Sequence, residues 1–199
     1  MGPSQSRDAM PKLFIFDLDD TLLHLWIDWE GAVKKEVLEY AEKEGLKLDP
    51  SEGIVHVAEK ASNTAERKKA VDGIFWKYEG ACLGNSRYSV YAQAREILVE
   101  LRKRGHKVAI ASNNTLQLIQ GALEAAGIEA DAIRGRDTVK KPKPHPDMLF
   151  SIMDELRFTR EDTIMIGDSF TDSGAGKAAE VRVIIVKPGE IDLKKVLGI

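Results

Sequence analysis

The sequence predicts an α/β fold in which a doubly wound parallel sheet is interrupted by a small helical insertion. Short apolar runs alternate with segments of helical periodicity, as expected for parallel strands that are joined by helices. The first apolar run ends abruptly at Asp17, which is typical of a strand buried on both faces. From about residue 23 to residue 88 the alternation stops, and helical segments follow one another without a convincing strand.

The strands of the sheet are expected at short, largely apolar runs, and the helices at segments whose apolar residues recur every three or four positions. The predicted strands span residues 12–16, 107–111, 131–134, 163–166 and 181–186. The predicted helices span residues 92–104, 116–126 and 148–156, and another begins near Asp172.

The interruption at residues 23–88 is expected to be an inserted helical domain, which leaves residues 10–22 and 89–199 for the α/β core. Asp49 to Glu52 combine an N-cap, a first-turn proline and a capping-box glutamate, so a second helix should follow Asp49. A third helix is expected over residues 65–78, and residues 80–89 should form the return hinge. The apolar stripes of the first and third helices are Trp29, Val33, Val37 and Tyr40, and Val71, Ile74, Phe75 and Tyr78.

The composition narrows the kind of partner. Among 199 residues, 32 acidic and 29 basic side chains give a formal charge of −3. The protein therefore has no strong positive electrostatic field that would attract nucleic acid or a membrane surface. A single cysteine, Cys82, excludes an internal disulfide, and no apolar run is long enough for a membrane span. We therefore expect a cytoplasmic protein with a small-molecule partner. Residues 1–9 are expected to be a tag remnant or a disordered terminus.

Two carboxylates follow the first predicted strand. Asp17 and Asp19 stand two positions apart, so both can project from the end of the sheet toward the crevice where α/β proteins bind ligands. Phosphoryl transfer requires a nucleophile and a proton carrier, and neighbouring carboxylates in different environments can divide these tasks. The alternative is a solvated turn or a helix-capping cluster.

A second acidic loop, Gly167 to Asp172, follows the predicted strand at residues 163–166. Asp168 and Asp172 could share one Mg²⁺ with the first loop, because Mg²⁺ prefers oxygen ligands and accepts a substrate phosphate as a further ligand. The alternative is that Asp168 or Ser169 only caps the following helix.

Two further segments offer groups that could bind phosphate. Ser112 and Asn113 follow the strand at residues 107–111, where a hydroxyl and backbone N–H groups can bind phosphate oxygens; the alternative is a helix N-cap. Lys143 lies between prolines that stiffen the backbone, which suits a phosphate clamp, and the alternative is a solvated basic linker. The four histidines lack metal-ligand spacing and are expected to have structural roles, and no nucleophile elbow or P-loop is present.

These four segments, taken in order, resemble the motifs of the haloacid dehalogenase superfamily of phosphatases and phosphomutases. Asp17-Leu18-Asp19-Asp20-Thr21-Leu22 is similar to the first motif, and Ser112 to the second. Lys143, followed by Pro-His-Pro-Asp, is similar to the third, and Gly167 to Asp172 to the fourth. The resemblance covers residues 10–199, is nearest to phosphoglycolate phosphatases, and implies a Rossmann-like core with a helical cap inserted after the first motif.

The resemblance also implies roles. Asp17 would attack phosphorus, and Asp19 would protonate the leaving oxygen and then activate water. Ser112 and Lys143 would hold the phosphoryl group. The implied Mg²⁺ ligands are the side chains of Asp17 and Asp168 and the backbone carbonyl of Asp19, with Asp172 orienting a metal-bound water.

The leading hypothesis is Mg²⁺-dependent hydrolysis of a small phosphomonoester such as phosphoglycolate or a sugar phosphate. Asp19 argues against a dehalogenase, which needs no acid for its leaving group. A phosphomutase keeps the same motifs and remains an alternative, as does a catalytically retired binding module. Lys141 also precedes a proline, but Lys143 is preferred because Pro-His-Pro-Asp-Met-Leu-Phe follows it. The sequence predicts neither the physiological substrate nor the oligomeric state.

Overall fold

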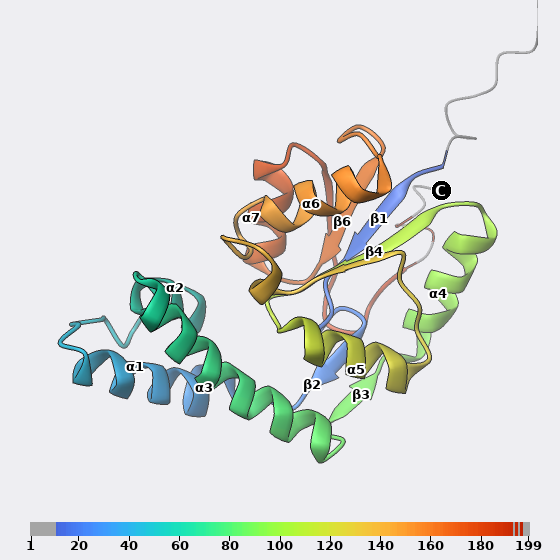
Figure 1. Ribbon diagram of the computed structural model, residues 1–199. Coiled ribbons are helices and arrows are strands. Elements are labelled where there is room, and N and C mark those ends of the chain that lie inside the picture. The colour runs from blue at the N-terminus through green and yellow to red at the C-terminus, as the bar shows by residue number, and fades with distance from the viewer. Residues whose placement is uncertain (1–10, 193, 195, 197–199) are drawn as a thin grey trace, which may run out of the picture. The chain divides into compact units, whose positions relative to one another are not determined.

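The computed structural model describes residues 11–192, 194 and 196 (Figure 1). The predicted tag or disordered terminus at residues 1–9 lies outside the described residues. The chain divides into two compact units: residues 26–88 form one, which we call the inserted unit, and the residues before and after it form the other, the core unit.

The core unit contains the predicted parallel sheet. Five strands lie in the order β5-β4-β1-β6-β7, and every pair of neighbours is parallel. The fold prediction is therefore confirmed, and each predicted strand is found within one or two residues of its expected bounds. The strands are β1 (Leu13–Phe16), β4 (Lys107–Ala111), β5 (Ala132–Arg134), β6 (Thr163–Gly167) and β7 (Arg182–Ile185).

Helices cover both faces of this sheet (Figure 1). They are α4 (Ala92–Lys103), α5 (Leu116–Ala126), α6 (Asp147–Leu156) and α7 (Phe170–Ala178), with a short 3₁₀ turn at Arg136–Thr138. Right-handed crossovers place α4 and α5 on one face and α6 and α7 on the other, because the chain moves outward from β1 to β5 and then returns past β1 to β7.

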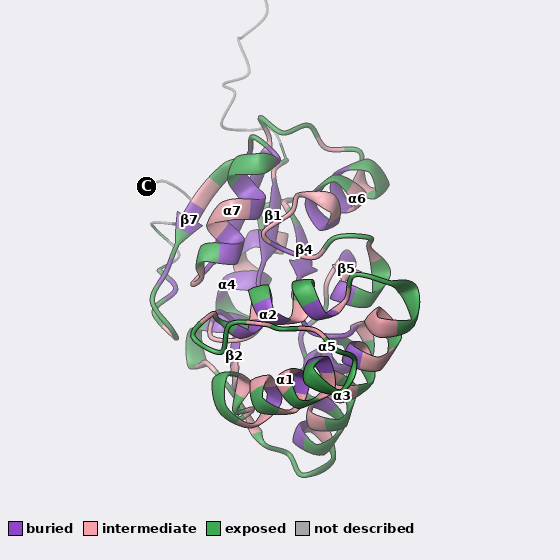
Figure 2. Ribbon diagram, turned by 90° about the vertical axis from the view of Figure 1, so that its left-hand side faces the viewer, coloured by how far each residue is buried: buried purple, intermediate pink, exposed green. Residues whose placement is uncertain are grey.

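Strand β1 is central, and all four of its residues are buried. Alternate strand residues point to opposite faces, so Leu13 and Ile15 pack with α6 and α7, where they join Met148, Ile152 and Ala175 in one apolar cluster. Figure 2 shows the central strands as the buried interior of the core unit. No polar side chain interrupts β1 before Asp17, which explains the uninterrupted apolar run in the sequence.

Two short strands form a separate two-stranded sheet, β2 (Leu23–Leu25) with β3 (Tyr88–Val90). The expectation of no strand between residues 23 and 88 is therefore wrong at the start of that region. Three-residue strands carry too little alternation to be recognised, and these two lie more than sixty residues apart in the chain.

The inserted unit is helical, as predicted. It contains a π-helical turn (Trp29–Val33), α1 (Lys34–Lys43), α2 (Ile54–Ala61) and α3 (Ala65–Gly84). The predicted stripes of the first and third helices meet in one apolar cluster, in which Val33, Val37 and Val71 are buried. No helix within the described ranges combines the length and the apolar character that a membrane crossing requires.

Two local predictions within the inserted unit are wrong. Asp49 does not cap a helix: its Oδ1 accepts hydrogen bonds from the Ser51 backbone N–H (2.8 Å) and hydroxyl (2.7 Å), which closes a turn, and α2 starts later with Gly53 at its N-cap. The return hinge does not begin at residue 80, because α3 continues to residue 84. Burial of Cys82, whose thiol donates to the Arg87 carbonyl, stabilises this extra turn.

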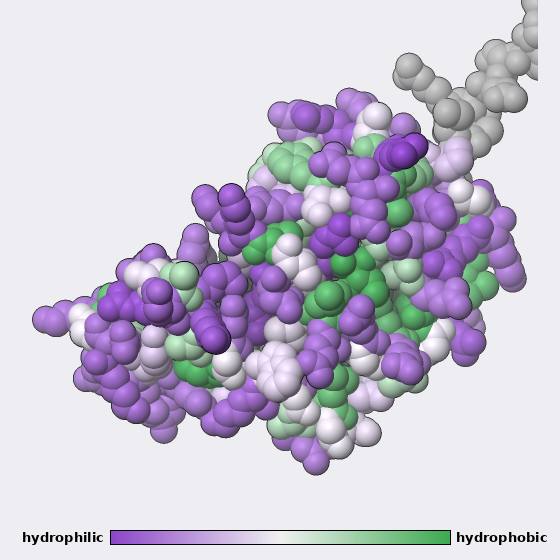
Figure 3. All heavy atoms as spheres, viewed as in Figure 1, coloured by the Kyte–Doolittle hydropathy of each residue, from purple (hydrophilic) through white to green (hydrophobic). Residues whose placement is uncertain are grey.

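Figure 3 shows that hydrophilic side chains cover most of the visible surface, with apolar side chains in smaller areas. This distribution agrees with the charged fraction of the sequence, 31%.

Candidate active site

The candidate site lies at the carboxyl ends of the three central strands. Strand β1 lies between β4 and β6, so the residues that follow these strands are neighbours. The Asp17 N–H donates to the Ile166 carbonyl (2.8 Å), and the Ser112 N–H donates to the Arg134 carbonyl (3.0 Å), which extends the sheet pairing into the loops. Asp168 follows β6 directly.

Lys143 joins two of the predicted acids. Its Nζ lies 2.7 Å from Asp17 Oδ1 and 2.5 Å from Asp172 Oδ1, and its side chain is only 1% exposed. A buried ammonium requires such partners, since desolvation without them would be very costly. Lys141, the alternative considered, is exposed, and the solvated-linker alternative does not apply to Lys143.

Asp172 is fixed by the start of α7. Ser169 is the N-cap of this helix, and Asp172 Oδ2 accepts hydrogen bonds from the Ser169 N–H (3.0 Å) and hydroxyl (2.6 Å) in a capping box. The capping alternative is thus correct for Ser169, and the same contact holds the Asp172 carboxylate toward Lys143. Gly167 is required here because a Cβ at that position would lie 2.2 Å from Asp172 Cγ.

The loop after β4 supports Lys143 from another side. Asn113 Nδ2 donates to the Lys143 carbonyl (2.8 Å), while the Ser112 hydroxyl accepts from the Asn114 N–H (3.3 Å) and side-chain amide (3.0 Å). Ser112 is not the N-cap of α5, because Thr115 occupies that position. Asn113 is predicted to bind substrate, and the structure shows its side-chain amide nitrogen engaged in holding the lysine segment.

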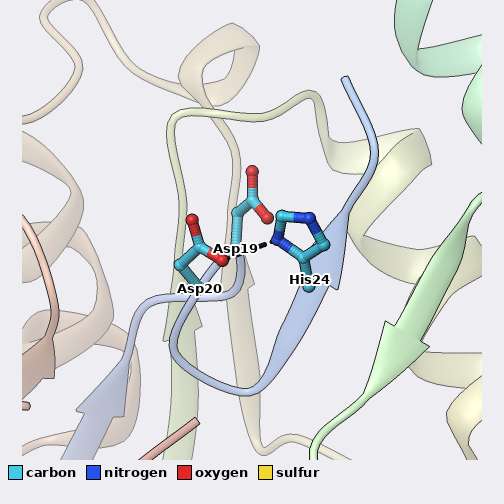
Figure 4. Close-up of side chains that lie close together, drawn as sticks. All are labelled: Asp19, Asp20 and His24. Atoms are coloured by element: carbon cyan, nitrogen blue, oxygen red, sulfur yellow. Dashed lines mark hydrogen bonds and ion pairs between the residues drawn. The ribbon is translucent and has the colours of Figure 1, made fainter. Parts of the chain in front are cut away.

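Asp17, Asp168 and Asp172 form a possible metal site. One carboxylate oxygen from each lies within 4.8 Å of the others. An all-oxygen donor set of this kind fits Mg²⁺. The Asp19 carboxylate is not part of this group: its Oδ1 accepts the Leu25 N–H (2.8 Å), and it lies with Asp20 and His24 in a second group (Figure 4).

The charge in this site is incompletely balanced. Burial raises the pKa of Asp17 to about 8, opposed by the attraction of Lys143 and reinforced by Asp172. Burial also raises the pKa of Asp168 to about 6, with further repulsion from Asp172 and Asp20. The pKa of Lys143 is raised because attraction to Asp17 and Asp172 exceeds the opposing effect of its burial. A divalent cation beside these carboxylates would restore the balance.

Several polar residues near the site were not singled out from the sequence. Thr21 is fully buried, and its hydroxyl donates to Asp168 Oδ1 (3.4 Å). Asn114 contacts the Ser112 hydroxyl, and Tyr91 donates to Asp20 (3.1 Å). Thr21 and Asn114 could have been proposed from their places in the strand-end loops, whereas Tyr91 carries no such signal.

The fold and the strand-end carboxylates define an α/β protein with an acidic site at the carboxyl ends of its central strands. The family model described as haloacid dehalogenase-like hydrolase matches residues 14–186, and the chain belongs to this family. The predicted family resemblance is confirmed.

Curated relatives within the family carry the names of phosphatases. A phosphoglycolate phosphatase of Rhodospirillum rubrum is 30% identical over 201 residues, which cover 90% of this chain and 81% of the relative. A pyrophosphatase PpaX of Bacillus mycoides is 29% identical over 98 residues, which cover 48% of this chain and 46% of the relative.

Solved structures share the fold at lower identity. A hydrolase from Pseudomonas syringae superposes with a TM-score of 0.66 at 22% identity, covering 92% of this chain and 89% of the other. CbbY from Rhodobacter sphaeroides, solved in complex with phosphate, superposes with a TM-score of 0.63 at 19% identity, covering 89% of this chain and 87% of the other.

Proposed function

We propose that this protein is a Mg²⁺-dependent phosphatase that hydrolyses a small phosphomonoester through an aspartyl-phosphate intermediate. The observation that carries the proposal is the buried contact of Lys143 with both Asp17 and Asp172 at the strand ends. A lysine held between two acids at the carboxyl ends of parallel strands suits a dianionic substrate, because its ammonium group can also donate hydrogen bonds to phosphate oxygens.

In this proposal Asp17 is the nucleophile. One of its carboxylate oxygens forms a bond to phosphorus while the bond from phosphorus to the ester oxygen breaks. Asp19 gives its proton to the departing oxygen, and it later takes a proton from the water that attacks the aspartyl phosphate. Ser112 and Lys143 hold the phosphoryl oxygens. Asn113 supports the segment that carries Lys143, and Asp172, fixed by the capping box, keeps the Lys143 side chain in place.

Mg²⁺ would be held by Asp17 and Asp168, with Asp172 nearby and the Asp19 carbonyl as a further ligand, and it would supply positive charge to the phosphoryl oxygens. With Asp19 protonated, Asp17, Asp168 and Asp172 contribute −3, and Mg²⁺ with Lys143 contributes +3. The site can then accept a phosphate dianion without net repulsion.

The substrate class proposed is a small phosphorylated metabolite of the phosphoglycolate or sugar-phosphate type. The name of the Rhodospirillum rubrum relative favours this class, and the name of the Bacillus mycoides relative adds pyrophosphate as a compound to test. The inserted unit, residues 26–88, is proposed to be the cap domain that selects the substrate. A cytoplasmic location remains a prediction from composition.

Asp17→Asn tests the proposal. Phosphate release from a panel of phosphomonoesters with Mg²⁺ should fall by at least about a thousandfold, since the amide cannot act as the nucleophile. Asp154→Asn makes the same chemical change on the exposed surface of α6 and should retain full activity. Wild-type turnover in Asp17→Asn would refute the assigned nucleophile.

The same panel separates the alternatives. A phosphomutase would return an isomerised phosphosugar without free phosphate, which ³¹P NMR of the products detects. A retired binding module would bind Mg²⁺ yet release no phosphate from any compound in the panel. Chelation of the metal should abolish turnover of a Mg²⁺-dependent phosphatase and leave a metal-independent one active.

A further inference from the structure

Asp20 has an unusual backbone conformation and two side-chain partners. Its φ is +59°, in the left-handed region that is uncommon for residues other than glycine. Its Oδ1 lies 2.7 Å from His24 Nδ1 (Figure 4). The same oxygen accepts a hydrogen bond from the Tyr91 hydroxyl at 3.1 Å. A carboxylate oxygen is an acceptor, so His24 donates through Nδ1.

The partners of Asp20 come from separate segments of the core unit. His24 is the middle residue of β2, and Tyr91 directly follows β3. The Tyr91 N–H also donates to the Leu22 carbonyl (3.1 Å), and its ring lies against Gly189, where a Cβ would be 2.8 Å from the ring. Burial and the neighbouring Asp20 raise the pKa of Tyr91 to about 12, so its hydroxyl remains a donor at neutral pH.

The same segment holds the Asp19 side chain. Leu25, the residue after His24, donates its N–H to Asp19 Oδ1 at 2.8 Å, and the Asp20 N–H donates to the Leu23 carbonyl at 2.7 Å. The orientation of the Asp19 carboxyl group therefore depends on the position of β2. That position in turn depends on the contact of His24 with Asp20.

We propose that Asp20, His24 and Tyr91 act together as positioning residues that orient the Asp19 carboxyl group toward the leaving-group oxygen. This inference rests on the proposed function, in which Asp19 is the proton donor. The ligand atoms of Asp19, Asp20 and His24 also lie within 4.8 Å of one another, but Asp20 and His24 already bind each other, which favours a positioning role over a second metal site.

Misorientation of the Asp19 carboxyl group has a chemical consequence that a general loss of stability does not share. A proton donor must lie within hydrogen-bond reach of its target, and its contribution is largest when the leaving group is a weakly acidic alcohol. A nitrophenolate ion leaves readily without a proton. Misorientation of Asp19 should therefore slow the cleavage of an alkyl phosphate far more than that of p-nitrophenyl phosphate.

The experiment compares kcat/KM for an alkyl phosphate and for p-nitrophenyl phosphate, because kcat/KM reports the step in which the ester oxygen leaves. Asp20→Gly removes the carboxylate and tolerates the left-handed backbone. It should lower kcat/KM for the alkyl ester about tenfold or more, and that for the nitrophenyl ester by less than about twofold. Asp20→Asn keeps an acceptor oxygen and should restore most of the loss.

A matched pair of tyrosine variants tests the same contact. Tyr91→Phe should shift the ratio of the two kcat/KM values in the same direction as Asp20→Gly, by about threefold or more. Tyr88→Phe, three residues earlier in β3, should leave the ratio unchanged. Thermal melts establish that each variant is folded.

The outcomes separate the two proposals. If the wild-type protein hydrolyses neither ester, the proposed function fails. If the wild type is active and Asp20→Gly slows both esters equally or neither of them, the positioning role is overturned while the proposed function stands.

Discussion

Replacement of Lys143 by methionine should destabilise the metal-free protein strongly and in a pH-dependent way. The change keeps the length and apolar stem of the side chain but removes the ammonium group that contacts Asp17 and Asp172. Both carboxylates are buried, at 7% and 0% exposure. Removing one partner from a buried ionic group costs about 3–5 kcal/mol, so we expect a loss of this size at pH 8.

The loss should shrink as the pH falls. Burial already raises the pKa of Asp17 to about 8 in the wild type, and without Lys143 no cation separates the two acids, so the folded variant is expected to bind one proton more than the folded wild type. One additional proton bound by the folded variant reduces the difference in unfolding free energy between wild type and variant by about 1.4 kcal/mol for each unit by which the pH falls. At pH 6 the destabilisation should therefore be about 1–2 kcal/mol, if it is about 4 kcal/mol at pH 8.

Urea titration in the presence of a chelator measures this loss. All three tryptophans (Trp26, Trp29 and Trp76) belong to the inserted unit, so far-UV circular dichroism is preferable to fluorescence. Lys141→Met is the control, because Lys141 is exposed and its replacement should change stability by less than about 0.5 kcal/mol. Equal stabilities of the two variants at both pH values would refute the role given to the buried lysine.

Two further outcomes are expected. Because burial raises the pKa of Asp168 to about 6 and that of Asp17 to about 8, the folded metal-free protein holds protons that the unfolded chain releases near its ordinary value of 3.8, and stability falls as the pH rises through this window. At a Mg²⁺ concentration a hundredfold above the Kd at pH 8, the melting temperature should therefore rise by about 5–10 °C at pH 8. The same concentration should raise it less at pH 5, and equal shifts at the two pH values would contradict the carboxylate site. In α4, Leu101→Ala should cost about 2–5 kcal/mol of unfolding free energy by leaving a cavity, whereas Val99→Ala, at a position 43% exposed, should cost less than about 0.5 kcal/mol. Urea titration compares the two, and similar losses would argue against the assigned faces of this helix.

The sheet could be predicted because its three central strands, β1, β4 and β6, are buried on both faces. A strand such as β1 cannot carry a polar residue until it leaves the sheet, so the change from Phe16 to Asp17 marks both its end and the start of the site. The inserted unit was recognised by its apolar stripes, which depend only on helical periodicity. Strands β2 and β3 were missed because their pairing joins segments distant in sequence.

The local signals failed where two polar interactions compete. The sequence around Asp49 satisfies a capping box, but the same carboxylate closes a tighter turn with Ser51, and the helix starts elsewhere. Gly80 and Gly84 suggested a hinge, yet an established helix tolerates glycine at a cost of about 1 kcal/mol each. Burial of Cys82 favours its continuation.

Within the site, residue types and strand ends indicated which side chains could meet, but not how they are connected. The contact of Lys143 with Asp17 spans 126 positions in the sequence, and its geometry follows from the loop between prolines. The role of Asn113 depends on which of its atoms contacts Lys143. The role of Tyr91 depends on a contact with Asp20, from which it is separated in the sequence by the inserted unit. Periodicity and composition carry no information about these contacts.

The central place of β1 has a consequence for how the chain is made. Its partners are β4, which begins at Lys107, and β6, which begins at Thr163, so this apolar strand is synthesised well before either of the strands that cover its edges. The helices of the inserted unit, whose contacts are closer in sequence, can form during that delay. The nascent chain must therefore keep Leu13–Phe16 from aggregating until β4, which ends at Ala111, has left the ribosome.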